Sequence, residues 1–460
     1  MAIRSFSPAD EPPTFYPQPR PMKSEFSRRK FLRQSAGAGL GLGLSHALAR
    51  AAEPTPAASA AAKPAVAPTA WPVSDELDES ALREVLRSGK WGRGNGRMVA
   101  EFEKAFAGRS GAAHCIATSC GTTALQTVLG ALDIGPGDEV VMPPYTFVAT
   151  FNAITANFAL PVFADVDPRT FQIDAGKVAA ALTADTRVLM PVHLGGAVAD
   201  MDAINALARG RRLTVIEDAC QAPLAEWRGR AVGTHGLAGC FSFQASKNLT
   251  SGEGGAVLTN DADLAARCLS FHDQGKIPTA PMPGRGSNYR LTEFQGALLL
   301  AQLTRFERQS KTRAENAAYL SQQLREIGGL APVELHEGCT RSAWHLYMFR
   351  YEAARFAGLT RAKFVRALAK EGVPCSTGYT PLNATPHVQA LATNRHYWKI
   401  YGEKTMKDWV ARSQCPANDR LCGEAVWFTQ NLLLGPRSDM DRLADVMRKI
   451  QRTAPELARA

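Results

Sequence analysis

Short apolar runs that alternate with helix-like segments constrain the fold of this chain more than any other feature. Between residues 114 and 259, periodic helical stretches such as 124–132 and 203–209 separate runs that are typical of strands. These runs cover residues 114–118, 139–142, 161–164, 188–192, 214–217 and 256–259. Strands joined through helices build a mostly parallel sheet that is covered on both faces. The sequence therefore predicts an α/β fold with a mostly parallel, mixed sheet sandwiched by helices.

The pattern changes near both ends of the 460 residues. A strand at 343–351 and amphipathic helices at 361–371 and 439–451 suggest a smaller α+β domain near the C-terminus. Residues 51–70 are rich in Ala, Pro, Thr and Ser, which is the composition of a flexible linker. We therefore expect four regions: a signal at 1–50, a linker at 51–70, a large domain at 71–333 and a small domain at 334–460.

The N-terminal segment has three features of a secretory signal. Paired arginines precede Phe-Leu in residues 27–32, a weakly apolar run follows at 36–49, and small residues around position 49 offer a cleavage site. The apolar run is too short and too rich in glycine to span a membrane comfortably. The alternative is a disordered tail with a chance arginine pair. The paired arginines favour export in folded form by the twin-arginine translocase, and hence a periplasmic or otherwise exported protein.

Composition excludes several functional classes. Seven basic and three acidic residues lie in the first 49 positions, which leaves +6 of the formal net charge of +10 on the rest. No basic stripe with interleaved aromatics accompanies that charge, so we expect no nucleic-acid partner. The nine cysteines are scattered and never spaced C-x-x-C, which argues against zinc sites and a disulfide framework. We expect no metal site, and we expect most cysteines to be small buried hydrophobes.

Polar residues follow most of the expected strands, where parallel sheets bind their ligands. Gly121, Thr122 and Thr123 follow a strand and open a helix, and the N–H groups of a helix N-terminus suit a phosphate. Asp218 ends another strand; taken alone, its carboxylate suits a metal ion, general-base chemistry or a pyridinium N–H. Ser242 and Lys247 follow an aromatic run and precede a glycine-rich turn. A desolvated lysine in this setting is suited to forming a Schiff base, although an ordinary surface lysine fits the local pattern as well.

The order of these groups distinguishes the two interpretations. From about residue 71 to the C-terminus the sequence resembles the DegT/DnrJ/StrS family of pyridoxal-phosphate-dependent sugar aminotransferases. The resemblance rests on GPGDEVVMPPYTFVAT (135–150), SNYRLTEFQGA (287–297), VWFTQNLLLG (426–435) and the stretches 119–125, 191–194, 217–221 and 241–259. It implies a fold like that of aspartate aminotransferase, with pyridoxal phosphate as the cofactor.

The resemblance implies roles for four residues around the cofactor ring. Lys247 is expected to form the Schiff base and then to move the proton between the substrate and the cofactor. Asp218 is expected to pair with the pyridinium nitrogen, which keeps the ring an electron sink. Gln221 is expected near the ring hydroxyl, and Phe147 is expected to stack on the ring face.

The cofactor phosphate is expected to have its own set of donors. They are Gly121, Thr122, Thr123 and Ser242. Asn288 is expected to reach the phosphate of a neighbouring subunit, since the family resemblance implies a homodimer with shared active sites. The implied reaction moves an amino group from glutamine or glutamate to a ketone.

The substrate side differs from many relatives. Ala222, Pro223 and Leu224 stand where many members carry His-Gly, two residues after the position of Gln221. The runs SKNLTSGEGG (246–255) and EAVWFTQNLLLG (424–435) are similar to the branch that acts on cyclitol ketones such as inosose. We therefore expect a cyclitol or sugar ketone as the acceptor.

Two other functions are open at this point. A sugar dehydratase of the same family typically carries histidine in place of the Schiff-base lysine, so Lys247 disfavours that reaction. A non-catalytic relative that binds the cofactor is disfavoured by the intact Lys247, Asp218 and Ser242.

Some residues have no assigned role from sequence. His193 caps a strand or faces the substrate. Tyr289 and Arg290 bind a substrate carboxylate or support the dimer interface. Trp344 and His345 are expected in the core or at the rim of the small domain.

Overall fold

A seven-stranded sheet forms the centre of the computed structural model, which describes residues 66–276 and 284–459. The strand order is β1-β11-β10-β7-β6-β2-β3. β11 pairs antiparallel with both of its neighbours, and the other pairings are parallel. The predicted mostly parallel, mixed sheet is therefore confirmed. The strands are β1 (His114–Thr118), β2 (Glu139–Met142), β3 (Leu160–Phe163), β6 (Thr186–Leu189), β7 (Thr214–Asp218), β10 (Ala238–Ser242) and β11 (Gly255–Thr259).

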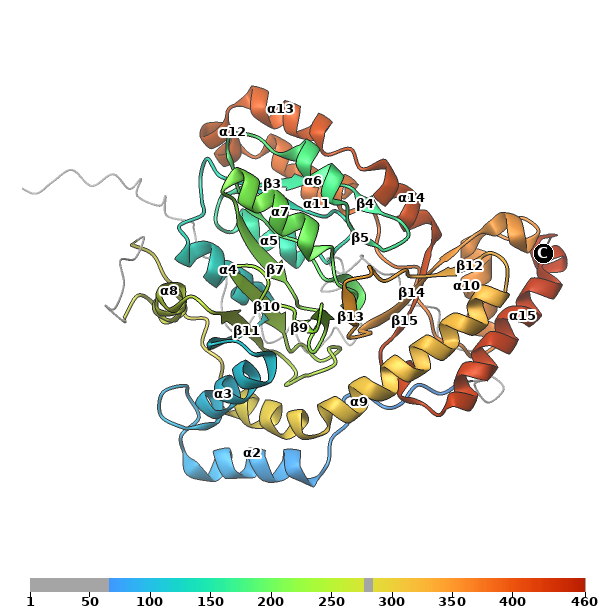
Figure 1. Cartoon of the computed structure of the whole chain (residues 1–460), viewed down its shortest axis with the longest axis horizontal. Helices are drawn as coiled ribbons and strands as arrows, with labels where there is room; N and C mark the ends of the chain where they lie inside the picture. Colours follow the sequence, from blue (N-terminus) through green and yellow to red (C-terminus); the bar gives the residue numbers. More distant parts are fainter. Residues whose placement is uncertain (1–65, 277–283, 460) are drawn as a thin grey trace, which may run out of the picture. The chain divides into compact units, whose positions relative to one another are not determined.

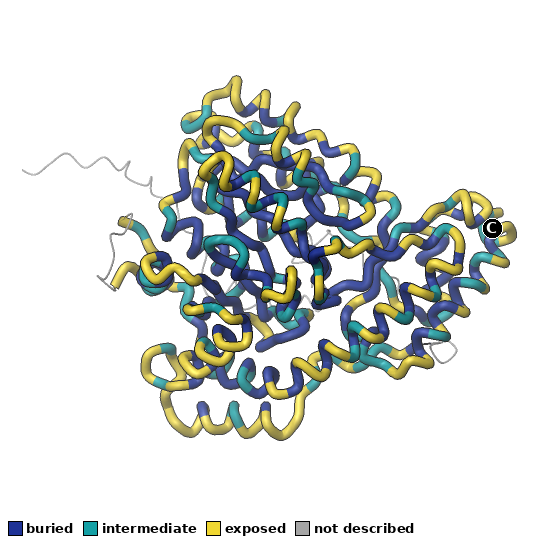
Figure 2. The backbone as a smooth tube through the Cα atoms, in the orientation of Figure 1, coloured by how far each residue is buried: buried dark blue, intermediate teal, exposed yellow. Residues whose placement is uncertain are grey.

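Side chains of the central strands alternate between two cores, because successive residues of a strand point to opposite faces. In β2, Val140 and Met142 join one core and Val141 joins the other. In β7, Ile216 and Val215 divide in the same way. Figure 2 shows the resulting buried centre beneath more exposed helices. Burial on both faces explains why the sequence shows continuous apolar runs here instead of a polar alternation.

Helices cover each face of this sheet. One core is closed by α4 (Gly121–Ala131), α5 (Ala149–Thr155) and α8 (Ala262–His272). The other is closed by α3 (Met98–Ser110), α6 (Ala175–Ala181), α7 (Met201–Arg211) and the first half of α9 (Glu293–Glu326). Two small sheets complete this part of the fold. One pairs β4 (Val166–Asp167) with β5 (Gln172–Ile173). The other has three strands, with β8 (Glu226–Trp227) between β9 (Arg230–Ala231) and β13 (Cys339–Arg341).

A second, antiparallel sheet lies in the C-terminal part. It contains β12 (Leu330–Pro332), β14 (Leu346–Tyr351) and β15 (Ala425–Thr429), in the order β12-β14-β15. Its core includes residues of α10 (Arg361–Lys370), α15 (Arg437–Arg459) and the second half of α9. The long α9 runs from α2 (Glu76–Ser88) and α3 at one end to α15 at the other (Figure 1).

The division into domains at residue 333 stays a prediction, because the described residues 66–276 and 284–459 all fall in one compact unit by their contacts. The cores also cross that position. Tyr397, Met406 and Trp409 come from the C-terminal part but pack into the core beneath α4 and α5. They belong to α12 (Arg395–Tyr401) and α13 (Glu403–Arg412). These helices, with α11 (Pro386–Gln389) and α14 (Pro416–Glu424), were not predicted from the sequence.

Most of the two regions predicted near the N-terminus lies outside the described residues. These are the signal at 1–50 and positions 51–65 of the linker. The last five linker positions are described, where Val66 is buried and Thr69 exchanges hydrogen bonds with Asn431. In the described ranges, no helix combines the length and apolarity needed to cross a bilayer. All nine cysteines fall in the described part, and none forms a disulfide.

Candidate active site

A cavity of about 540 Å³ lies where the carboxyl ends of the central strands meet the C-terminal part. Its floor comes from the turns after β1, β2, β7 and β10, as expected for ligands on a parallel sheet. Seven of the nine predicted site residues line it: Gly121, Thr122, Phe147, Asp218, Gln221, Ser242 and Lys247. The structure therefore brings together side chains that are more than one hundred positions apart in sequence.

Asp218 is a buried carboxylate at the end of β7. Its Oδ2 accepts a 2.8 Å hydrogen bond from the Thr150 hydroxyl, and its Oδ1 accepts one of 3.2 Å from the Cys220 N–H. Its backbone is held on both sides, because Asp218 N donates to Pro191 O and His193 N donates to Asp218 O. The carboxylate is therefore fixed toward the cavity while it keeps lone pairs free for a cationic N–H.

Beside Asp218, Glu217 and His193 form a fully buried pair with a structural role. The Glu217 carboxylate accepts hydrogen bonds from His193 Nε2 at 3.0 Å and from the N–H groups of Gly233, His235 and Gly236 at 2.7 Å each. Burial raises the pKa of Glu217, but these hydrogen bonds outweigh burial and leave the pKa below its ordinary value. His193 Nδ1 accepts from Ala199 N–H, so the ring does not face the substrate.

Lys247 lies in the loop after β10, with its side chain at the cavity wall. Burial lowers the pKa of its amine below the ordinary value, against the opposing effects of Cys220 and Asp218. A lowered pKa increases the fraction of free amine, which is the form that attacks a carbonyl. The Nε1–H of Trp71 donates a 2.9 Å hydrogen bond to Ala245 O and so holds this loop two residues before the lysine.

The turn that begins α4 faces the same cavity. A Cβ at position 121 would lie 2.7 Å from Ser242 Cβ and 2.8 Å from Cys220 Sγ, so only glycine fits between the strand ends. Among the described residues, the N–H groups of Gly121 and Thr122 have no acceptor. Free N–H groups at a helix N-terminus, together with the nearby Thr122 and Ser242 hydroxyls, suit an anionic oxygen ligand.

Two predicted cofactor contacts lie outside this cavity. The Thr123 hydroxyl donates to Cys120 O at 2.8 Å and accepts from Cys120 N–H at 3.0 Å, so it stabilises the start of α4. The hydroxyl of Thr123 therefore has partners within its own chain, and its contact with a phosphate stays a prediction. Asn288 pairs with Asp273 in an isolated bridge and does not line the cavity of its own chain. Its contact with a neighbouring subunit stays a prediction.

The residues next to Asn288 support the strand ends. The Tyr289 carbonyl accepts a 2.7 Å hydrogen bond from Ser119 N–H, immediately after β1. Arg290 forms an ion pair with Asp273. Within this chain, neither side chain lines the cavity.

Gln221 connects the floor of the cavity to its opposite wall. Its Oε1 accepts from Gly195 N–H at 2.8 Å, and its Nε2 donates to the Tyr379 hydroxyl at 3.2 Å. Burial raises the pKa of Tyr379 to about 12. Phe147 is 57% exposed at the cavity, which leaves its ring face available to a planar ligand.

Sequence reasoning missed several residues of the wall. Thr150 lies at the end of the stretch 135–150 that resembles the family, but nothing in its spacing indicates a bond to Asp218. His345, Leu346, Tyr379 and Trp427 also line the cavity and come from the C-terminal part. Trp427 lies in the stretch 426–435 that resembles the family, but nothing in that stretch indicates a place in the cavity, and no stretch that resembles the family contains the other three. His345 was expected in the core or at the rim of the small domain and not as a catalytic residue; in the structure it is buried and lines the cavity.

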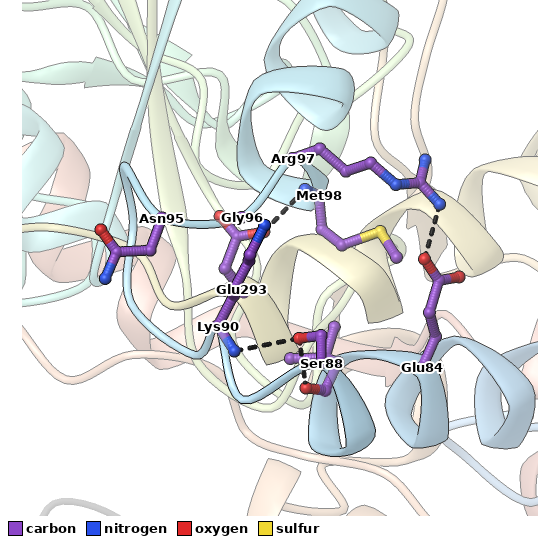
Figure 3. Close-up of a pocket in the computed structure, with 9 residues that line it drawn as sticks. Glu84, Ser88, Lys90, Asn95, Gly96, Arg97, Met98 and Glu293 are labelled. Atoms are coloured by element: carbon purple, nitrogen blue, oxygen red, sulfur yellow. Dashed lines mark hydrogen bonds and ion pairs between the residues drawn. The ribbon is translucent and has the colours of Figure 1, made fainter.

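Figure 3 shows a second hollow, of about 500 Å³, between α2, the start of α3 and the start of α9. Here the Glu293 carboxylate accepts a 2.7 Å hydrogen bond from Met98 N–H and thus occupies the N-terminus of α3. The partial positive charge at the N-terminus of α3 is therefore neutralised by Glu293, whereas the N-terminus of α4 has no carboxylate partner of this kind among the described residues. Arg97 at its edge is paired with Glu84 and Glu101.

The residues of the first cavity fit pyridoxal phosphate. Asp218 offers a carboxylate for a ring N–H, and Lys247 offers an amine for the aldehyde. The start of α4 offers a space for a phosphate, and a Cβ at position 121 would fill that space. No described residues form a group of three or more His, Cys, Asp or Glu side chains that is placed to hold a metal ion.

Comparison with known proteins gives consistent results. The family model of the DegT/DnrJ/EryC1/StrS aminotransferase family matches residues 72–417. L-glutamine:2-deoxy-scyllo-inosose aminotransferase from Streptoalloteichus tenebrarius is 39% identical, over 84% of this chain and 95% of that protein. L-glutamine:scyllo-inosose aminotransferase from Streptomyces griseus is 34% identical, over 85% and 95%. The crystal structure of 3-amino-5-hydroxybenzoic acid synthase superposes with a TM-score of 0.75 at 32% identity, covering 84% of this chain and 99% of that one.

Proposed function

As a member of the DegT/DnrJ/EryC1/StrS aminotransferase family, the chain is a pyridoxal-phosphate-dependent aminotransferase, and we propose that it aminates a cyclitol or sugar ketone with glutamine or glutamate as donor. The names of the relatives from Streptoalloteichus tenebrarius and Streptomyces griseus support a cyclitol ketone and L-glutamine. The observation that carries the proposal is that Lys247 and Asp218 line the same cavity of about 540 Å³.

The residues of the site divide the chemistry between them. Bound pyridoxal phosphate supplies a ring that withdraws electrons from the substrate. Asp218, held by Thr150 and Cys220, would accept a hydrogen bond from the ring nitrogen of the bound cofactor and so favour its protonated form. Lys247 would hold the cofactor through its Nζ, and the same amine would move a proton from the substrate carbon to the cofactor carbon. Thr122, Ser242 and the start of α4 would hold the phosphate.

The charge of the cavity supports a neutral ketone as acceptor. Among the described residues that line it, Lys247 is the single basic side chain. A nucleotide diphosphate would require further arginine or lysine partners, whereas a polyol needs hydrogen-bond donors and acceptors. The cavity offers these through Gln244, Ser246, Glu253, His345 and Tyr379.

The test begins with the purified, cofactor-loaded protein. Borohydride reduction followed by peptide mass analysis is expected to place the cofactor on Lys247. L-glutamine or L-glutamate is expected to change the visible spectrum of the cofactor, and scyllo-inosose to reverse that change. A cofactor on another lysine would contradict the site, and inertness toward both donors would contradict the transfer.

The dimer with shared sites belongs to this proposal. Leu86 and Trp91 are 57% and 51% exposed near α2, and exposed apolar groups of this size favour a protein interface. Asn288 does not line the cavity of its own chain, which leaves a contact with the partner's cofactor as its proposed role. Mixing inactive Lys247→Ala and Asn288→Ala chains is expected to restore activity, because a heterodimer then contains one complete site. No restoration in a confirmed heterodimer would contradict sharing.

Export by the twin-arginine translocase is proposed from residues 27–49, which lie outside the described residues. The route carries folded proteins, so the cofactor would be inserted before export. Replacing Arg28 and Arg29 by lysine is expected to retain the enzyme in the cytoplasm of a bacterial host, as measured by cell fractionation. Unchanged periplasmic activity would contradict the route.

A further inference from the structure

A chain of hydrogen bonds joins the residue after Lys247 to the opposite wall of the cavity. Asn248 is buried, and its Nδ2 donates a 2.7 Å hydrogen bond to Ala343 O. The same side chain contacts His345 Nδ1 through its Oδ1 at 3.1 Å. Because the carbonyl of Ala343 accepts only, the amide orientation of Asn248 is fixed.

This orientation determines the tautomer of His345. Asn248 Oδ1 is an acceptor, so His345 Nδ1 must carry the proton and donate it. Burial, followed by the positive charges of Lys247 and Arg313, holds the pKa of His345 well below its ordinary value. The ring is therefore neutral, and Nε2 carries a lone pair.

Arg313 contributes an uncompensated charge to this region. It is fully buried in α9, donates from Nε to Gln430 Oε1 at 2.8 Å, and lies 5.2 Å from the centroid of the Trp71 ring. Within the described part of the chain it has no carboxylate partner. Its charge disfavours a second cation nearby and so helps to keep His345 neutral.

The lone pair of His345 is available to a ligand. The residue lines the cavity, and its Nε2 has no hydrogen-bond partner in the described ranges. The Nε2 atoms of His272 and His336 are enclosed and unpartnered, whereas Nε2 of His345 is not enclosed. Nε2 is thus an accessible hydrogen-bond acceptor in the same cavity as Lys247, and a ligand can donate to it.

We propose that His345 is a specificity-determining residue, whose Nε2 accepts a hydrogen bond from a hydroxyl of the ketone substrate while Asn248 fixes its tautomer. The inference rests on the proposed function, since it requires a polyhydroxy ketone in the cavity. A site that offers a fixed acceptor favours a substrate hydroxyl over a C–H at the same place.

The test compares two ring ketones in the second half of the reaction. Cofactor-loaded enzyme is first converted with L-glutamine and then mixed with scyllo-inosose or with cyclohexanone, which lacks the hydroxyls. His345→Phe is expected to lower kcat/KM for scyllo-inosose on the order of 10-fold, the value of one net hydrogen bond, and to leave cyclohexanone unaffected. His345→Gln places an amide oxygen near the position of Nε2 and is expected to restore most of the preference.

Controls separate recognition from folding. Conversion of the cofactor by L-glutamine is measured in both variants, and a cofactor spectrum that still responds reports an intact cofactor site. His336→Phe alters a partly buried histidine that does not line the cavity, and no change in preference is expected. Equal losses with the two ketones, or an unchanged preference in His345→Phe, would overturn the inference. A wild-type enzyme inert toward scyllo-inosose would instead overturn the proposed acceptor, and the inference with it.

Discussion

The Thr150 hydroxyl donates a 2.8 Å hydrogen bond to Oδ2 of Asp218, which joins the first turn of α5 to the carboxylate at the end of β7. The two residues are separated by 68 positions in the sequence, and both are buried. This bond holds one carboxylate oxygen and leaves the remaining lone pairs of Asp218 for the cofactor.

Thr150→Val is expected to weaken cofactor binding, because it removes a hydrogen bond to a charged group. Such bonds contribute about 1.5–3 kcal/mol, so the Kd for pyridoxal phosphate should rise roughly 10- to 100-fold. Titration of the cofactor-free protein measures this change. Thr127→Val is a matched control, since the Thr127 hydroxyl is bonded to Thr123 O within α4. If both variants bind equally well, Thr150 does not support Asp218.

Lys247→Met is expected to stabilise the cofactor-free protein at neutral pH. Burial lowers the pKa of Lys247 in the folded state, so the unfolded chain binds more protons below the ordinary value of 10.5. Wild-type stability should therefore rise with pH toward 10.5, and the variant should lack this component of the slope. Urea unfolding at several pH values measures it. Lys177→Met, at an exposed lysine of α6, should leave the slope unchanged.

Glu217→Gln is expected to destabilise the fold by about 1.5–3 kcal/mol. The amide NH₂ of glutamine would face N–H donors where Glu217 now accepts four hydrogen bonds. Because the folded pKa of Glu217 is lowered, its contribution is present above its ordinary pKa of 4.5 and is lost as the pH falls through the folded value. Denaturant unfolding should therefore show a weaker acid dependence in the variant.

The control for Glu217 is a carboxylate near the surface. Glu226→Gln removes a partner that lies 3.7 Å from Arg341, and such pairs contribute about 0–1 kcal/mol. Equal destabilisation by the two substitutions would show that the buried network around Glu217 has no special importance.

Gly121→Ala is expected to impair cofactor binding about 10-fold or more, because the added Cβ displaces Ser242 and Cys220 by some tenths of an ångström. Gly108→Ala is the opposite case. Nothing lies within 4 Å of a Cβ at this position in α3, so the substitution should stabilise the protein by about 0.5–1 kcal/mol. Cofactor titration and thermal unfolding of both variants distinguish a local fit from a general effect of alanine.

Much of the sheet could be predicted from the sequence, because strands buried on both faces appear as separate apolar runs. The strands at Glu139–Met142 and His114–Thr118 match the expected ranges, and other strands differ by a few residues at their ends. The helix at Glu76–Ser88 has a helical apolar periodicity in its sequence, yet its Leu77 and Leu86 are 53% and 57% exposed. Periodicity indicates that a helix is amphipathic, and it does not identify what covers each face.

The site could be predicted where function lies in a motif after a strand, as for Asp218 and Lys247. The phosphate contact of Thr123 stays a prediction, because a hydroxyl in the first turn of a helix serves equally well to cap it. Trp427 lies in the stretch 426–435 that resembles the family, but that stretch does not indicate a place in the cavity. The places of His345 and Trp427 depend on how β14 and β15 lie against the large sheet, and long-range packing leaves no local pattern of that contact.

The hydrogen bond from Trp71 to Ala245 joins the beginning of the described chain to the loop of Lys247. The Trp71 ring also lies beside the buried guanidinium of Arg313. The residues just before it are held as well, because Val66 is buried and Thr69 exchanges hydrogen bonds with Asn431. A chain shortened past Trp71 would therefore lose a support of the Lys247 loop and the aromatic neighbour of a buried cation at once.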